Sequence, residues 1–256
     1  MDIRRTRMQY GVTDMMCELP VGNEPAAGGG LRAVISLERA GNMALSRRRD
    51  LPWRAGLCSL LGLEEERVLG LRQVHSQRVV VVDGGQNEAL AAEEADGMIT
   101  DRPDAVLSAT VADCLPIFLH DAASGAFGLV HSGWKGTGIV VKALRAMRDR
   151  YGTRAQDVAV TIGPGIGPCC YRVPEERADL FARQFGAETV VRNQDGAPSL
   201  DLRAANLALL REAGVTAVTV VEDCTGCSEA LGSFRRQGPA HYTLMLSCIG
   251  RWGRGK

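Results

Sequence analysis

The stretch from Leu107 to Gly136 constrains the fold of this chain most, because it reads as three short apolar strands separated by turns. Asp113 and Cys114 follow the first of these strands, and His131 ends the third. A thiolate and a neutral imidazole at strand ends, beside a glycine-rich turn, are typical of a metal site or of a Cys–His dyad. A further ligand from elsewhere in the chain is needed to decide between the two.

Strand and helix patterns interleave along the rest of the sequence. Alternating or continuous apolar runs predict strands over Leu31–Glu38, Val68–His75, Arg78–Asp83, Asp157–Gly163, Ala217–Cys224 and His241–Cys248. Helical periodicity predicts helices over Leu51–Glu65, Thr137–Gly152, Glu175–Gly186 and Leu200–Gly214, with Asp50 as an N-cap of the first. The first 30 residues are poorly patterned. Without a repeat or linker, the sequence predicts one α/β (α+β) domain over residues 1–256.

Composition excludes several classes of function. Lysine plus arginine and aspartate plus glutamate number 30 each, so net charge gives no argument for nucleic acid or an anionic membrane as partner. No apolar run approaches the roughly 20 residues of a membrane span, and the N-terminus lacks a signal-peptide pattern. The eight cysteines are scattered in a chain without an export signal. We therefore expect a cytoplasmic protein with functional thiols rather than disulfides.

Two of the four histidines stand out by position. His75 ends the predicted strand in LRQVHS, and His131 follows the apolar run AFGLV, whereas His120 and His241 read as structural or solvated. With Cys114 they make three ligands at predicted strand ends. Three protein ligands and an open fourth position are typical of a catalytic zinc. The competing interpretation is a nucleophilic Cys114 activated by a histidine, which needs no metal.

Four further cysteines form two close pairs, Cys169-Cys170 and Cys224-Thr-Gly-Cys227. The second pair is typical of half a zinc knuckle or of a redox pair. No second Cys-x-x-Cys exists, so a knuckle built from two such pairs is excluded. Neighbouring side chains diverge in an extended chain, and we therefore expect Cys169 and Cys170 to be packing or pocket-wall thiols.

Several cations are candidates for binding an anion. Lys135 lies in GWKGTG before a predicted helix, although this turn lacks the Walker pattern. Arg235 lies in SFRRQG after the CTGC segment, Arg54 lies at the start of the early helix, and Arg72 precedes His75 by three positions. We predict Arg72 and Cys114 as catalytic residues, and Arg54, Lys135 and Arg235 as substrate contacts. Asp113 either orients a metal ligand or has a structural hydrogen-bonding role.

The motifs taken in order resemble the YfiH family, long labelled laccase-like or polyphenol oxidase proteins. The matching segments are RQVHS, ADGMIT, ADCLPIFL, HSGWKG, IGPGIGPCCYRV, LDL, CT and SFRR, which run from Arg72 to Arg236. Each motif is short, but the ordered set is specific, and the resemblance extends from about Arg32 to the C-terminus.

The resemblance implies one α/β domain with layered mixed sheets and one zinc ion held by His75, Cys114 and His131, with copper as the weaker alternative. It implies a purine nucleoside phosphorylase acting on adenosine, inosine and methylthioadenosine that also deaminates adenosine, so the partners are a small nucleoside and phosphate. A hydrolase that edits peptidoglycan precursors and a metal-binding module without turnover are the alternatives. Copper-dependent phenol oxidation fits least, because multicopper centres need more than four histidines.

Two segments depart from the family pattern. Trp53-Arg54 stands where relatives usually carry Asn-Arg, and His241-Tyr242 stands where they often carry Gly-Arg. If these residues contact the substrate, we expect an altered specificity.

Overall fold

The computed structural model describes residues 1–11, 14–22, 30–44, 52–84 and 87–253. The larger of its sheets has seven strands in the order β1-β13-β10-β8-β9-β6-β5. Their bounds are Asp2–Thr6 (β1), Ala217–Val221 (β13), Val158–Ile162 (β10), Leu115–Asp121 (β8), Phe127–Ser132 (β9), Gly97–Thr100 (β6) and Val79–Val81 (β5). Parallel pairs at both edges flank antiparallel β10, β8, β9 and β6, so the sheet is mixed.

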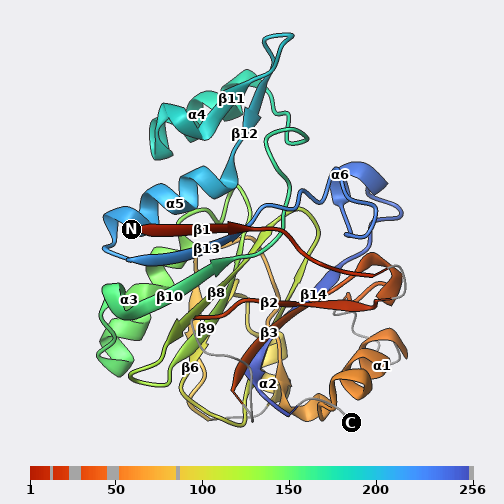
Figure 1. Cartoon of the computed structure of the whole chain (residues 1–256), viewed down its shortest axis with the longest axis vertical. Helices are drawn as coiled ribbons and strands as arrows, with labels where there is room; N and C mark the ends of the chain where they lie inside the picture. Colours follow the sequence, from red (N-terminus) through yellow and green to blue (C-terminus); the bar gives the residue numbers. More distant parts are fainter. Residues whose placement is uncertain (12–13, 23–29, 45–51, 85–86, 254–256) are drawn as a thin grey trace.

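A second sheet has five strands in the order β2-β3-β14-β7-β4. Their bounds are Met16–Leu19 (β2), Leu31–Ser36 (β3), Met245–Arg251 (β14), Val106–Val111 (β7) and Val68–Leu69 (β4). Only the β4–β7 pair is parallel among these strands. The hairpin of β11 (Val190–Arg192) and β12 (Pro198–Leu200) forms a small third sheet, which lies with α4 (Glu175–Phe185) at the top of Figure 1.

Helices cover the outer faces of the two large sheets. α3 (Ile139–Tyr151) and α5 (Leu202–Glu212) lie on one side of the molecule and α1 (Pro52–Leu61) on the other (Figure 1). Short α2 (Asn87–Ala92) and α6 (Phe234–Gln237) lie in connections. One-turn 3₁₀ helices occupy Glu38–Ala40, Glu65–Arg67, Ala155–Asp157 and Ala187–Thr189. The predicted N-cap Asp50 lies outside the described residues.

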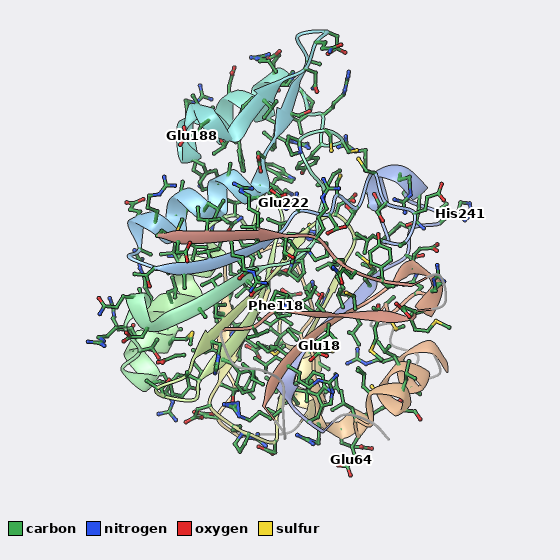
Figure 2. All side chains as sticks on the ribbon, in the orientation of Figure 1. Glu18, Glu64, Phe118, Glu188, Glu222 and His241 are labelled. Atoms are coloured by element: carbon green, nitrogen blue, oxygen red, sulfur yellow. The ribbon has the colours of Figure 1, made fainter. Side chains whose placement is uncertain are left out.

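Three apolar layers hold these elements together. The side of α3 that carries Val140, Leu144 and Met147 packs with α5 on the seven-stranded sheet, as its periodicity predicts. A second layer joins the two sheets, and Phe118, at the centre of Figure 2, is fully buried in it. The third layer lies between α1 and the five-stranded sheet. The order is therefore helix, sheet, sheet, helix, which confirms the predicted mixed α/β class.

The chain crosses between the two large sheets at two places that matter for function. β7 belongs to the five-stranded sheet and β8 to the seven-stranded sheet, and Cys114 lies in the turn between them. β4 and β5 are likewise in different sheets, and His75 lies in the connection between them. The two crossings and the end of β9 bring three predicted residues together.

Two sequence predictions are wrong in detail. The stretch Val68–His75 is not one strand, because β4 ends at Leu69 and the chain then leaves the five-stranded sheet. The poorly patterned N-terminal segment contains β1 and β2, two edge strands. β1 shows no clean alternation because its exposed charges face solvent, and register comes from parallel pairing with β13 instead.

Candidate metal centre and pocket

The structure brings His75, Cys114 and His131 into one group. A ligand atom from each residue lies within 4.8 Å of the others. The two imidazole rings approach edge to face, with centroids 4.9 Å apart. Cys114 and His131 are neighbours because Leu115 pairs with Ser132 and Pro116 with His131 across β8 and β9. Two imidazoles and one thiol at this spacing can hold a metal ion and leave a position open.

His75 is placed by a loop rather than by the end of a strand. Its φ angle is 59°, in the left-handed region that non-glycine residues seldom adopt. The buried carboxylate of Asp96 accepts hydrogen bonds from the backbone amides of Val74, His75 and Ser76 at 3.2, 3.0 and 2.6 Å. These bonds offset the cost of the backbone conformation, on the order of 1 kcal/mol. The loop therefore presents His75 to the other two side chains.

Asp96 also orients His131. Its Oδ1 atom lies 2.9 Å from His131 Nδ1, so Nδ1–H donates to the carboxylate. The other ring nitrogen, Nε2, is then the atom that can bind a metal ion. Burial acts to raise the pKa of Asp96, but bonds from His131 and Ser76 lower it to about 2. Asp96 is therefore a fixed anion that sets both the tautomer and the ring position.

The electrostatics of the group favour the thiolate form of Cys114. Burial raises the pKa of the thiol, but the charge of His131 and hydrogen bonds from His131 and His75 lower it to about 7. Burial lowers the pKa of His131, while Cys114 and Asp96 raise it to about 10. The thiolate is the form of cysteine that binds metals and attacks electrophiles.

Gly133 leaves the space that the Cys114 sulfur occupies. A Cβ atom at position 133 would lie 2.6 Å from Cys114 Sγ and 3.6 Å from His75 Cδ2. Any larger residue would therefore push the sulfur out of the group. This close approach explains the first of the two glycines in HSGWKG.

Asp113 has a structural role and does not orient a ligand. Its φ angle is 82°, and His75 and Asp113 are the non-glycine residues with positive φ in the described part of the chain. Asp113 Oδ1 accepts from Thr225 Oγ1 at 2.6 Å and Ser233 Oγ at 2.7 Å, and Oδ2 accepts from the Arg235 amide at 2.7 Å. Asp113 thus anchors the start of α6 to the turn that carries Cys114.

A cavity of about 560 Å³ opens in front of the three-residue group. Its volume is typical of a site for a small molecule. Four aromatic and two cationic side chains contribute to its wall: Trp134, Tyr171, Phe234, Tyr242, Arg177 and Arg235. Burial raises the pKa of Tyr171 to about 12, with a further contribution from Cys114, so its hydroxyl stays protonated at neutral pH.

The predicted cations differ in where the structure places them. Arg235 lines the cavity, and its guanidinium lies 5.3 Å from the centroid of the Tyr171 ring. Arg72 is exposed and pairs with Glu94 at 3.0 Å. Lys135 is exposed and lies 5.6 Å from the Trp134 ring centroid, in a smaller neighbouring depression. Arg54 lies on α1, 3.4 Å from Ser108 Oγ. Arg72, Lys135 and Arg54 do not line the larger cavity.

Sequence reasoning missed several residues of this site. Asp96 is in the ADGMIT motif, and its signal is a carboxylate directly before a buried strand. Arg177 lies on α4, where its charge reads as part of a solvated helix face, yet its guanidinium lies 4.6 Å from the Trp134 ring centroid. Tyr242 stands out in the sequence only as a departure from the family pattern, and its ring contacts Phe234 with ring centroids 5.1 Å apart. His241, its neighbour, is exposed at the margin of Figure 2.

The four paired cysteines form a second cluster, contrary to expectation. Cys169, Cys170, Cys224 and Cys227 have sulfur atoms that all lie within 4.8 Å of one another. Adjacent cysteines diverge only in an extended chain, and residues 168–170 form a turn instead. The expected divergence of the two side chains is therefore wrong, while the prediction of packing or pocket-wall thiols stays a prediction for Cys170, and Cys169 lines a small depression.

Comparison with known proteins identifies the family of this chain. Residues 52–251 match the family model described as multi-copper polyphenol oxidoreductase laccase. The crystal structure of YlmD from Geobacillus stearothermophilus superposes with a TM-score of 0.82 at 30% identity and covers 96% of this chain and 99% of that one. The chain belongs to the YfiH family. The resemblance inferred from the ordered motifs is thereby confirmed.

Curated relatives of this YfiH-family chain carry enzyme names. A purine nucleoside phosphorylase of Mycobacterium tuberculosis is 36% identical over 189 residues, which are 73% of this chain and 74% of that protein. An adenosine deaminase from an unknown prokaryotic organism is 34% identical over 203 residues, or 74% of this chain and 78% of that protein. These names support an enzyme that acts on a small molecule. Among the described residues, no helix is long and apolar enough to cross a membrane.

Proposed function

We propose that this protein is a zinc-dependent purine nucleoside phosphorylase that cleaves adenosine, inosine and methylthioadenosine and also deaminates adenosine. One observation carries the proposal. His75, Cys114 and His131 face a cavity whose wall combines aromatic rings with two arginines. A purine needs flat apolar surfaces, and phosphate needs cations near the reacting bond.

The donor set supports zinc as the metal. Two imidazoles and a thiolate are ligands that zinc favours, and Gly133 makes room for the sulfur. When bound in a three-ligand site, zinc supplies a Lewis acid and lowers the pKa of a coordinated water. The same ligands also suit copper, but a multicopper centre does not fit a chain with four histidines.

Aromatic residues and arginines bind different parts of the substrates. The aromatic wall offers Tyr171, Phe234 and Tyr242 as faces for the purine and ribose. Arg177 and Arg235 supply positive charge for phosphate, and each is held over an aromatic ring that limits its motion. Phosphate fixed in this way is positioned to attack the anomeric carbon as the glycosidic bond breaks.

A hydrogen bond to the departing purine or amine stabilises the charge that develops on it. Tyr171 keeps its hydroxyl proton at neutral pH and lies in the cavity wall. We infer that this O–H donates a hydrogen bond to the leaving group. Asp96 meanwhile keeps Nδ1 of His131 protonated and the ring fixed.

The relatives support both activities. A purine nucleoside phosphorylase and an adenosine deaminase are comparably similar to this chain, at 36% and 34% identity. Both reactions begin with a purine nucleoside in a cavity. We infer that one cavity serves both, with phosphate required only for cleavage of the glycosidic bond.

The test is incubation of purified, metal-analysed protein with adenosine and with inosine, each with and without phosphate. We expect free base and sugar phosphate from both nucleosides only when phosphate is present, and inosine from adenosine without phosphate. Absence of all these products from the zinc-loaded protein would overturn the proposal.

A hydrolase with Cys114 as nucleophile, acting for example on cell-wall precursors, is the second candidate. The lowered pKa of Cys114 beside His131 favours it. Ligation and nucleophilic attack are separated by the zinc content of Cys114→Ala, His75→Ala and His131→Ala. Equal loss of this zinc in all three variants supports ligation, whereas retention in Cys114→Ala supports a nucleophile.

A further inference from the structure

Two turns that are distant in sequence bring four sulfur atoms together outside the cavity. The sulfur of Cys227 lies 3.5 Å from that of Cys169 and 3.4 Å from that of Cys170, and Cys224 completes the group within 4.8 Å. A tetrahedral ion with metal–sulfur bonds of about 2.3 Å places its sulfurs about 3.8 Å apart. The four atoms are thus close to the arrangement that one ion requires.

The backbone of both turns is built to point the sulfurs inward. The amides of Cys170 and Tyr171 donate to Gly167 O, each at 3.0 Å. The amides of Cys227 and Ser228 donate to Cys224 O at 3.1 and 3.0 Å. Each cysteine pair therefore lies in a hydrogen-bonded turn. Cys224 and Cys227 have the spacing of the ligand pairs in structural zinc sites, and the turn at Cys169 and Cys170 brings two adjacent sulfurs to the same group.

The backbone amide of Gly167 and the missing side chain of Gly226 suit the cluster to thiolates. The Gly167 amide donates to Cys224 Sγ at 3.1 Å, a bond that stabilises negative charge on sulfur. A Cβ atom on Gly226 would lie 2.8 Å from Cys170 Sγ and 2.6 Å from Cys170 Cβ. Gly226 therefore leaves room for the sulfur group, as Gly133 does at the other cluster.

Positive charge lies near both segments. The Arg203 guanidinium donates to Gly165 O at 2.9 Å and to Asp223 O at 2.7 Å, so it joins the two cysteine-bearing segments. Arg235 Nη1 donates to Cys170 O at 3.2 Å. Four thiolates around a divalent ion carry a net charge of about −2, which these two arginines partly offset.

We propose that Cys169, Cys170, Cys224 and Cys227 hold one zinc-type divalent ion in a closed, structural tetrathiolate site. Binding replaces the four thiol protons with the ion, and no electron is transferred. Four protein ligands leave no open position, which is the pattern of structural zinc. An iron–sulfur cluster needs its four thiolates farther apart, because several atoms separate them.

The proposed site fixes one wall of the cavity. Tyr171 follows Cys170 directly, and Arg235 donates both to Cys170 O and to Arg172 O, the latter at 3.0 Å. An ion at the cluster therefore links the segment before α4 to the segment before α6. Its loss should loosen Tyr171 and Arg235 without changing His75, Cys114 or His131.

The test compares the metal content of four proteins purified under reducing conditions: the natural protein, Cys114→Ala, Cys227→Ser, and Cys58→Ala as a buried-cysteine control on α1. We expect Cys227→Ser to lose an ion that Cys114→Ala retains, and Cys58→Ala to match the natural protein. Cobalt loaded into Cys114→Ala should give the intense sulfur-to-cobalt absorption of a tetrathiolate.

Either of two results would overturn the proposal. One is that Cys114→Ala contains no metal, while Cys227→Ser contains as much metal as the natural protein. The other is an intact mass two hydrogens lower, with no metal at the cluster, which would mean a disulfide. If Cys227→Ser fails to fold, the cobalt spectrum of Cys114→Ala alone tests the proposal, because this variant keeps all four sulfurs of the cluster. Absence of the tetrathiolate absorption would then overturn it. The result does not depend on nucleoside turnover, so it stands apart from the proposed function.

Discussion

The two thiol clusters of this protein differ in ligand number and in what surrounds them. The first has two histidines and one cysteine, lies where the chain crosses between sheets, and faces a cavity of about 560 Å³. The second has four cysteines, lies in two hydrogen-bonded turns, and includes two exposed residues, Cys169 and Cys227. An open set of ligands beside a cavity suits chemistry, whereas a closed set suits attachment of one segment to another.

The comparison is tested most strongly by removing one ligand from each cluster. We expect His131→Ala to lower nucleoside turnover by more than about a hundredfold, because it removes a ligand itself and not merely an outer partner. We expect Cys227→Ser to keep measurable turnover at low temperature and to lower the melting temperature. Steady-state kinetics and thermal unfolding check the pair, and equal turnover losses would contradict the distinction.

Two glycines offer a matched pair of smaller changes. Gly133→Ala places a Cβ 2.6 Å from Cys114 Sγ, and Gly226→Ala places one 2.8 Å from Cys170 Sγ. Each methyl group should lower the metal occupancy of its own cluster and leave the other unchanged, because each sulfur must move away from its group. Metal analysis after dialysis against a weak chelator measures this. Loss of both ions from either variant would mean that the clusters are not independent.

The Asp96 carboxylate should affect the metal affinity of the first cluster and not that of the second. Asp96→Asn removes the charge that accepts from His131 Nδ1 and from the loop amides. We expect about 10- to 100-fold weaker metal binding at the first cluster, the usual effect of losing such a partner. Competition with a chromophoric chelator gives the affinity, and the cobalt spectrum of the tetrathiolate serves as the internal control. An unchanged affinity would show that Asp96 only supports the loop.

The smallest effect is expected from the cations. Arg177→Met should raise the KM for phosphate by about tenfold with little change in kcat, because it removes a charge from the cavity wall worth about 1.4 kcal/mol. Lys135→Met is the matched control, since Lys135 lies outside this cavity. Phosphate titration at saturating nucleoside measures both. A larger effect from Lys135→Met would restore the sequence prediction and displace Arg177.

Local patterns predicted much of the fold. Periodicity located α3, α4 and α5, and apolar runs located β7, β8 and β9, because burial on a sheet or helix face leaves a direct trace in the sequence. The edge strand β1 left little trace, since its partner β13 lies far along the chain and sets its register. The edge strand β2 is only four residues long, too short for a clear pattern. The strand predicted up to His75 ended early because the chain there changes sheets.

At the candidate site, too, the sequence predicted what depends on residue type and missed what depends on distant packing. His75, Cys114 and His131 were found because their residue types are rare and their chemistry is specific. Arg72 was predicted from its nearness to His75 in the sequence, and Lys135 from a glycine-rich turn before a helix. Neither pattern fixes where the side chain points, and neither residue lines the cavity. Arg177 enters it only through the packing of α4, which no local pattern reveals.

The two sheet crossings have a kinetic consequence. Cys114 and His75 lie on the segments that pass between the sheets, so any separation of the sheets pulls on two of the three proposed ligands. Escape of an ion held by the first cluster should then follow the rate of this opening rather than the strength of its bonds alone. A change in the apolar layer between the sheets, such as Phe118→Leu, would shorten the residence time of an ion that it never touches.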